Sequence, residues 1–370
     1  MFKRITVSIL IASALVLSAC ASPTASPTPV PTTPVTLPTV APTETLVPTT
    51  QSSPTPTVAP TSVPGNLPDI GASNYLDDRS TPAALMLSYF NALNRQEYLR
   101  AYAYYQDTTS IGTFDEFMKG YADLQSVSVV FGAISSEGAA GSIYYTVPMI
   151  LNSIQTSGAQ QKYAACYILR LPQPANFTAP PITPMHIDHG TAANIPLATS
   201  DTAALASACT GADYPTGPIS QPAAVENITD ISKTNYIDNR SDPISVISSL
   251  MNAVNSRQYV RAYSYWQTPD QTYNVFNAGY FNTQSVTVQF GTPTSNPGAG
   301  QLYYSLPTVL HSTLKDGTQQ TFVGCYEFHL SQPAIQATPP FAPLGIISGK
   351  FTEVANDADV TSMLATACQP

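Results

Sequence analysis

Charged side chains are scarce in this chain of 370 residues. Asp, Glu, Lys and Arg together make up 10% of the residues, well below the roughly 25% usual for soluble domains. The chain has 14 basic and 23 acidic residues, a net charge of -9, and its basic side chains cluster only between Arg95 and Arg100. Proteins that bind nucleic acid gather Lys and Arg to neutralise phosphates. We therefore expect no nucleic acid among the partners.

Long apolar runs are also missing. A membrane-spanning helix needs about 20 mostly apolar residues, and the stretch from Ile5 to Val16 is too short. Lys3 and Arg4 precede it, as in a secretion signal. The following Leu-Ser-Ala-Cys resembles the bacterial lipobox. The resemblance implies a lipoprotein signal peptide at residues 1–20, a lipidated Cys20, and anchoring of the chain to the membrane or envelope of a bacterial cell, outside the cytoplasm.

Residues 21–68 are rich in Pro, Thr and Ser and contain few large apolar side chains. Such a segment cannot bury enough apolar surface to offset the entropy of ordering. Its prolines favour extended polyproline II structure. We expect a disordered stalk that, at about 3.1 Å per residue, holds the rest of the chain on the order of 100 Å from the membrane.

The remainder of the sequence is duplicated. NYLDDRS at Asn74 returns as NYIDNRS at Asn235, and QSVSVVFG at Gln125 returns as QSVTVQFG at Gln284. We predict one module at 69–212, a linker at 213–232 and a second module at 233–370. Comparing the two copies then shows which side chains both have kept.

Four cysteines remain once Cys20 is assigned to lipid. Cys166 and Cys325 correspond between the copies, as do Cys209 and Cys368, and both pairs are displaced by 159 positions. Four cysteines allow three pairings. Duplication favours disulfides within modules, because each module must have folded before it was copied. Neither pair has the close spacing of a zinc site, so we expect no metal and an oxidising compartment.

Each module is predicted to begin with helices. Ser80-Thr81-Pro82 supplies a capping hydroxyl and a first-turn proline, and Asp242-Pro243 repeats the device. Leu85, Tyr89 and Leu93 recur at helical spacing. After a polar break at 94–96, further helices are expected over 98–105 and 114–124.

Strands are predicted next. Residues 126–131 alternate with a period of two, and longer strands are expected over 142–154 and 161–171, joined by a Ser-Gly turn. Short terminal helices are expected at 202–209 and 359–368. The second cysteine of each module would then link a terminal helix to the strand that carries the first. The fold class is α+β, with a sheet packed on helices.

The order of these elements resembles the NTF2-like (cystatin-like cone) superfamily. The segments that suggest it are SYFNALNRQEYLRAYAYY and SLMNAVNSRQYVRAYSYW, which are similar to an opening helix, a polar hinge and a second, Tyr-rich helix. The resemblance covers about the first hundred residues of each module. It implies two tandem modules in which N-terminal helices pack on a curved antiparallel sheet, forming a pocket that serves catalysis in some members and binding in many.

Histidine offers little support for catalysis. The four histidines stand opposite other residues in the copy: His186 opposite Gly345, His189 opposite Ser348, His311 opposite Asn152 and His329 opposite Arg170. A mechanism shared by both modules therefore cannot use histidine. His186-Ile187-Asp188-His189 offers two imidazoles and a carboxylate to a metal, but we favour a solvated loop or edge strand there. We predict no catalytic residues and no cofactor.

Three polar pairs are kept in both copies: Asp77 with Asp238, Arg79 with Arg240, and Arg100 with Arg261. A structural role is favoured for all of them. Asp77 and Arg79 lie just ahead of the first helix, where a carboxylate near free amides is stabilising and an Arg can pair with the sheet or with a helix end.

Aromatic side chains are the best-kept candidates for binding. They combine a flat face with a hydrogen-bonding group, which suits sugar, peptide and protein ligands. Adjacent strand residues face opposite ways, so one of Tyr144 and Tyr145 should be exposed or line a pocket. The candidates are Tyr98, Tyr102, Tyr105, Tyr144 and Tyr145 in the first module and Tyr259, Tyr263, Trp266, Tyr303 and Tyr304 in the second.

The sequence therefore predicts a lipid-anchored binding or structural protein without catalysis, whose partner is a small ligand, a polysaccharide or a protein. One alternative is an enzyme that keeps an acid/base pocket in one module only. Another is binding of cell-wall polysaccharide through exposed aromatic side chains.

Overall fold

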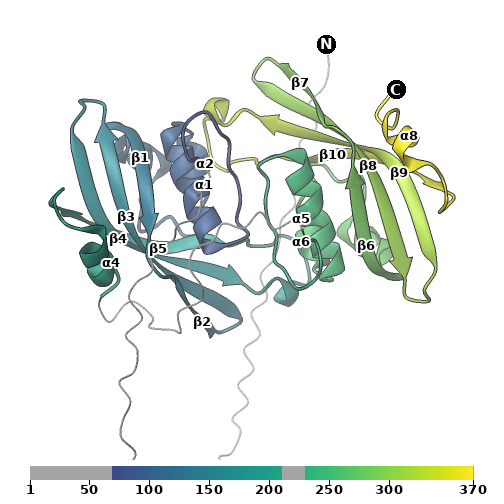
Figure 1. Cartoon of the computed structure of the whole chain (residues 1–370), viewed down its shortest axis with the longest axis horizontal. Helices are drawn as coiled ribbons and strands as arrows, with labels where there is room; N and C mark the ends of the chain where they lie inside the picture. Colours follow the sequence, from purple (N-terminus) through teal and green to yellow (C-terminus); the bar gives the residue numbers. More distant parts are fainter. Residues whose placement is uncertain (1–68, 211–229, 370) are drawn as a thin grey trace, which may run out of the picture. The chain divides into compact units, whose positions relative to one another are not determined.

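A computed structural model describes residues 69–210 and 230–369 (Figure 1). The predicted signal peptide with Cys20, the stalk at 21–68 and most of the linker lie outside these described residues. Within the described ranges, no helix is long and apolar enough to cross a membrane.

The described residues form two copies of one α+β arrangement, as the sequence predicts. The first module comprises α1 (Pro82–Asn94), α2 (Tyr98–Tyr102), α3 (Phe114–Gly120), β1 (Leu124–Phe131), β2 (Ser135–Ala139), β3 (Ser142–Gln155), β4 (Gln160–Pro172), a 3-10 turn (Pro174–Asn176), β5 (His186–Ile195) and α4 (Asp201–Ala208). The second comprises α5 (Pro243–Asn255), α6 (Tyr259–Tyr263), α7 (Tyr273–Gly279), β6 (Thr283–Phe290), β7 (Thr294–Gly298), β8 (Gln301–Leu314), β9 (Gln319–Ser331), a 3-10 turn (Pro333–Ile335), β10 (Gly345–Val354) and α8 (Val360–Leu364).

Each module contains one antiparallel sheet of five strands. The order is β1-β3-β4-β5 in the first module and β6-β8-β9-β10 in the second. The short β2 pairs with the first residues of β3, and the short β7 pairs with the first residues of β8. Helices α1 and α5 pack on these sheets (Figure 1), and their apolar side chains form each core together with those of the strands.

The helices begin where the sequence predicts. Thr81 Oγ1 accepts from Ala84 N at 3.1 Å, and Asp242 Oδ1 accepts from Ser245 N at 3.0 Å. Such caps satisfy amides that lack a partner in the first turn. The polar break after the helix contains Gln96 with φ 57°, a left-handed conformation that ends a helix.

The second and third helices end earlier than predicted. The expected helix over 98–105 stops at Tyr102, because Tyr104 O leaves the helical pattern to accept from Ile187 N at 2.8 Å. The expected helix over 114–124 stops at Gly120. Leu124 is already paired with Gln155 in the sheet. In both cases pairing with a strand competes with the helix for backbone groups.

The short strands β2 and β7 have no counterpart in the prediction, whereas a solvated loop or edge strand was expected at the start of β5. β2 reads Ser-Ser-Glu-Gly-Ala and follows no alternating apolar pattern. Its register on β3 is fixed by a tight turn at Ala140 and Gly141, with φ 47° and 76°, the values of a type I′ hairpin. β5 runs along β4 as the edge strand, and its later residues are mostly exposed.

Both disulfides lie within modules. Cys166 in β4 is bonded to Cys209, directly after α4, with a Cα separation of 5.2 Å, and Cys325 in β9 is bonded to Cys368 with 5.0 Å. The terminal helix of the second module is shorter than the predicted 359–368, since it ends at Leu364. The chain then continues in turns to the cysteine.

Candidate functional site

The two copies of the NYLDDRS segment meet backbone to backbone where the modules join. Arg79 N donates to Asp238 O at 2.7 Å, and Arg240 N donates to Asp77 O at 2.6 Å. Each bond is the image of the other with the modules exchanged. The junction is therefore pseudo-symmetric, and residues kept in both copies lie on it.

Serine side chains add a second pair of reciprocal hydrogen bonds between the modules. Ser241 Oγ accepts from Asp77 N at 2.8 Å, and Ser80 Oγ accepts from Asp238 N at 2.9 Å. The serine that opens one module's helix thus satisfies a backbone amide of the other module. Buried backbone amides need such partners.

Two tyrosines cross the junction. Tyr75, from the first module, packs against the core of the second, and Tyr236 packs against the core of the first. Arg100 lies over the Tyr75 ring at 4.6 Å, and Arg261 lies over the Tyr236 ring at 4.8 Å. Burial, together with the charge of Asp77, raises the pKa of Tyr75 well above its usual value. Each core is completed by a side chain of the other module.

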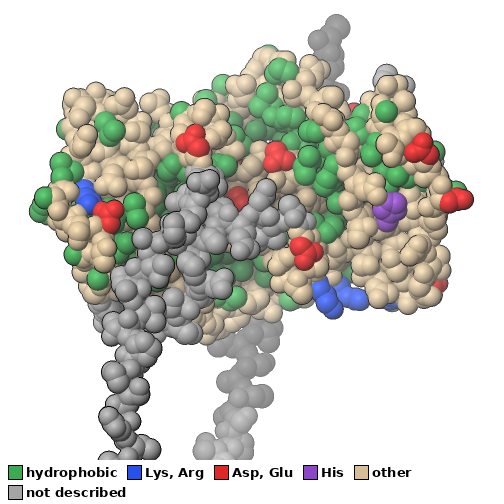
Figure 2. All heavy atoms as spheres, in the orientation of Figure 1, with side chains coloured by type: hydrophobic (Ala, Val, Ile, Leu, Met, Phe, Trp, Pro, Cys, Tyr) green, Lys and Arg blue, Asp and Glu red, His purple; other side chains and the backbone are tan. Residues whose placement is uncertain are grey.

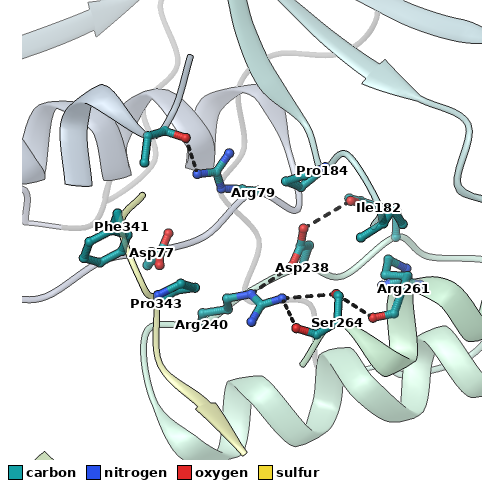
Figure 3. Close-up of a pocket in the computed structure, with 12 residues that line it drawn as sticks. Asp77, Arg79, Ile182, Pro184, Asp238, Arg240, Arg261, Ser264, Phe341 and Pro343 are labelled. Atoms are coloured by element: carbon teal, nitrogen blue, oxygen red, sulfur yellow. Dashed lines mark hydrogen bonds and ion pairs between the residues drawn. The ribbon is translucent and has the colours of Figure 1, made fainter. Parts of the chain in front are cut away.

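A pocket of about 190 Å³ lies at this junction (Figure 3). Asp77 and Arg79 from one module and Asp238 and Arg240 from the other line it together with Arg261. The kept carboxylates and guanidinium groups therefore come together in a cavity. Its chemistry depends on whether these groups are free to act.

The two junction arginines are engaged by backbone carbonyls. Arg79 Nη1 donates to Met185 O at 2.9 Å and Nη2 to Ala103 O at 3.1 Å, at the end of α2. Arg240 Nη2 donates to Ser264 O at 3.1 Å, at the end of α6. The predicted pairing of an Arg with a helix end is confirmed, and it fixes α2 and α6 to the junction.

The two junction aspartates accept from buried tyrosines. Tyr104 OH donates to Asp77 Oδ1 at 2.8 Å, and Tyr265 OH donates to Asp238 Oδ1 at 3.0 Å. Burial, with the neighbouring carboxylate, raises the pKa of both tyrosines. The expectation that Asp77 meets the free amides of the first helix is wrong, because Thr81 caps that helix.

The third kept arginine is buried in each module. Arg100 is 1% exposed, Arg261 2%. Arg100 Nη2 donates to Asn91 Oδ1 at 2.9 Å and Nε to Glu97 Oε2 at 2.7 Å. In the second module Gln258 replaces this glutamate and accepts from Arg261 Nε at 2.7 Å. The pair is part of the packing, and not a surface pair.

Asp78 and Asn239 are the point at which the junction departs from symmetry. Asn239 Nδ2 donates to Asp78 Oδ2 at 3.3 Å, and Asp78 Oδ1 accepts from Ser80 N at 2.8 Å. Burial raises the pKa of Asp78 to about 6, although the hydrogen bonds from Ser80 favour its charged form. Nearby Asp77 and Asp238 also raise it.

Most of the aromatic candidates belong to the cores. The side chains packed against the two clusters are Tyr98, Tyr102, Tyr105 and Tyr145 in the first module and Tyr263, Trp266 and Tyr304 in the second. Tyr102 OH donates to Gly112 O at 2.9 Å. Trp266 Nε1 is buried without a hydrogen-bond partner among the described residues. These side chains stabilise the fold and offer little surface to a ligand.

Three aromatic candidates lie differently. Tyr303 is 44% exposed and stacks on His329 with ring centroids 4.9 Å apart. Its counterpart Tyr144 lies under the Arg170 guanidinium at 5.5 Å. The prediction that one residue of each strand pair is exposed or lines a pocket is confirmed for the second pair by Tyr303. In the first pair both Tyr144 and Tyr145 are half-buried. Tyr259 stacks nearly parallel on Tyr280 at 6.1 Å.

The histidines do not come together. His186 is buried, and its Nδ1 contacts Pro184 O at 2.9 Å. Burial lowers the pKa of this imidazole. His189 is 43% exposed and pairs with the adjacent Asp188 at 2.9 Å. Both lie on β5, the edge strand that we favoured over a metal site, and the described residues contain no cluster that could hold a metal ion.

Two pairs of structural asparagines, Asn91 with Asn252 and Asn94 with Asn255, were not predicted from the sequence. Asn94 hydrogen-bonds to the backbone of β1. Its Oδ1 accepts from Val127 N at 2.7 Å and its Nδ2 donates to Val127 O at 3.0 Å. Asn255 does the same with Val286. The signal was present in the repeat, where FNALN and MNAVN keep both asparagines.

Comparison with known proteins gives no relative for this chain: no protein-family description, no curated protein and no solved structure matches it.

Proposed function

We propose that this chain is a bacterial lipoprotein, anchored outside the cytoplasm through lipid on Cys20, whose paired modules bind a ligand or partner without catalysis. The lipobox-like ending of the apolar N-terminal run supports the anchor. The two disulfides support an oxidising compartment, since such bonds persist mainly outside the cytoplasm.

We further propose that each module is NTF2-like. In each, the helices come first and pack on one face of a sheet of long antiparallel strands. This order and layering support the proposal. The cysteine link between the last helix and the sheet is an addition to that arrangement.

The observation that carries the non-catalytic role is the engagement of the polar side chains kept in both modules. Asp77 is bonded to a tyrosine, Arg79 to two carbonyls and Arg100 to Asn91 and Glu97. A catalytic acid or base needs a group with access to a substrate proton. The kept side chains are instead bonded to partners within their own module.

The interior of the first module is filled with packed aromatic rings, which supports ligand binding outside the proposed cone. Tyr89 is fully buried, and its ring contacts those of Phe90, Tyr104, Tyr105 and Tyr167. Ring centroids in these contacts lie 5.0 to 6.3 Å apart, the spacing of close-packed aromatic pairs. A ligand would have to displace this packing to enter.

Two measurements test the proposal. Cys20→Ala should move the protein from the membrane fraction to the soluble fraction, and wild-type protein left in the soluble fraction would contradict the anchor. Purified protein incubated with cell-wall fragments should be retained on them while releasing no new reducing ends or free amines. The enzyme alternative would be favoured if the wild-type protein released such products and a variant lacking Asp188 and both histidines on β5 did not.

A further inference from the structure

The second module carries a groove whose chemistry differs from the matching surface of the first. The groove has a volume of about 510 Å³ and lies between the start of α6, α7, the loop after α7 and the β8–β9 turn. The side chains that matter for binding are Arg257, Tyr259, Asn274, Asn277, Phe281 and Lys315. They supply two cations, two amides and two aromatic rings.

Phe281 is the most exposed aromatic side chain of this groove. It is 70% exposed, and Lys315 Nζ lies 4.4 Å from its ring centroid. The loop is held in place, because Phe281 N donates to Ala278 O at 3.1 Å and Lys315 N donates to Asn282 O at 2.9 Å. A flat apolar face is therefore fixed beside a cation and left open to solvent.

A second groove, of about 420 Å³, shares Arg257 with the first and adds Lys233. Lys233, Arg257 and Lys315 are three of the four exposed cations of the described part of this module, and none is in an ion pair among the described residues. The one carboxylate lining either groove is Asp230, which accepts from Ser232 N at 2.9 Å. On the face shown in Figure 2 charged side chains are few, and most of them are acidic.

Tyr98 of the first module matches Tyr259, but the other ring and the three cations of these grooves have no match there. Ala72, Gln96, Ala122 and Thr156 stand where the second module has Lys233, Arg257, Phe281 and Lys315. Each difference gives the second module a cation or an aromatic ring. An exposed phenylalanine adds nothing to the core. The need to fold therefore does not explain why the second module has these four side chains.

We propose that these two grooves bind an anionic glycan. The apolar face of a sugar ring would stack on Phe281, Asn274 and Asn277 would hydrogen-bond to hydroxyl groups, and the three cations would pair with spaced carboxylate or phosphate groups. Three cations spread over two grooves do not form the dense cluster with which proteins neutralise the phosphates of nucleic acid. The inference rests on the proposed binding role, but it is independent of how the chain is anchored.

Binding of the full chain to immobilised polymers tests this site. Polygalacturonate represents sugar rings with spaced carboxylates and phosphomannan represents sugar rings with phosphates, while dextran, polyglutamate and an oligonucleotide are the comparisons. We expect retention on one or both of the first two, and weaker retention on the other three. Phe281→Ala should weaken binding about tenfold and Lys315→Gln about threefold, and the matched surface variant Lys350→Gln should bind as wild type.

Several outcomes would overturn the site. Binding to neither anionic glycan, equal binding to polyglutamate or the oligonucleotide, or unchanged affinity of Phe281→Ala would each do so. Phe281 and Lys315 are exposed, so the variants should keep the wild-type unfolding midpoint, which circular dichroism checks. A failure here with intact membrane fractionation and wall retention would reject the groove and leave the proposed function standing.

Discussion

Asp78 and Asn239 occupy the same position of the repeat and face each other across the junction, with Asn239 Nδ2 3.3 Å from Asp78 Oδ2. Because one side chain donates and the other accepts, the pair is suited to joining a first module to a second. Two copies of the same module would place like groups opposite each other. The difference of one residue therefore favours pairing within the chain over pairing between identical modules.

Replacing Asn239 by Asp should destabilise the protein at neutral pH. Two carboxylates would then face each other in a partly buried site, where repulsion is screened poorly, and we expect a loss of about 2 kcal/mol. The loss should disappear near pH 4, where the carboxylates are protonated. Urea unfolding at pH 7.5 and pH 4 measures both values.

The exchanged double variant, Asp78→Asn with Asn239→Asp, is the control for this effect. Pseudo-symmetry lets the two residues trade places, so the double variant should recover most of the lost stability. Equal destabilisation of the single and double variants would show that the contact between the two side chains does not matter.

Isolated modules should pair with themselves, but to different extents. A segment of residues 230–370 should form a dimer at pH 7.5, because Asn239 would face a second Asn239. A segment of residues 69–210 would place two Asp78 carboxylates together. Since burial raises the pKa of Asp78 in the folded chain to about 6, protonation favours the paired state, and its dimer should strengthen as pH falls from 7.5 to 5. Sedimentation velocity checks this, and a monomeric second module would refute the pseudo-symmetric junction.

Arg100 should be essential for stability and Glu97 should not. Arg100→Met removes bonds to Asn91 and to Glu97 and leaves the buried carboxylate with Arg95 alone, which should cost about 3–5 kcal/mol. Glu97→Gln should cost less than about 1 kcal/mol, because the second module already has Gln258 there. Chemical unfolding of the two variants decides the matter, and similar losses would contradict the argument.

Ionisation of the buried tyrosines should coincide with alkaline unfolding. Burial raises the pKa of Tyr89, Tyr104 and Tyr167 well above the usual value of about 10. A folded-state pKa above that of the unfolded chain gives stability that is complete below pH 10 and is lost as pH rises further. Phenolate absorbance should therefore rise in a cooperative step together with loss of the circular dichroism signal. Gradual ionisation without unfolding would show that these rings are accessible.

The repeat made much of the fold predictable. Thr81 and Pro82 marked the start of α1, and the equal displacement of the cysteines indicated their pairing. β2 could not be predicted, because Ser, Glu and Gly give it no apolar pattern and the hairpin turn alone sets its register. β5 is an exposed edge strand that depends on pairing with β4.

The sequence showed which residues of the junction are the same in both copies, but it did not show what they contact. Comparing the copies singled out Asp77, Arg79 and Arg100. One partner in the junction lies 164 positions away along the chain. Residue spacing within one module cannot predict such contacts with the other module. The groove at Phe281 was missed for the opposite reason. Comparing the copies draws attention to what both keep, whereas this surface consists of what one copy changed.

The crossed packing of Tyr75 and Tyr236 also has a mechanical consequence. The chain ahead of Asp69 leads directly into a segment that is bonded to both modules, so tension applied there loads both cores together and shears the backbone bonds of Arg79 and Arg240. Separate domains in series would instead yield one after the other. In a single-molecule pulling experiment the two modules should resist as one unit, with the first rupture at the highest force.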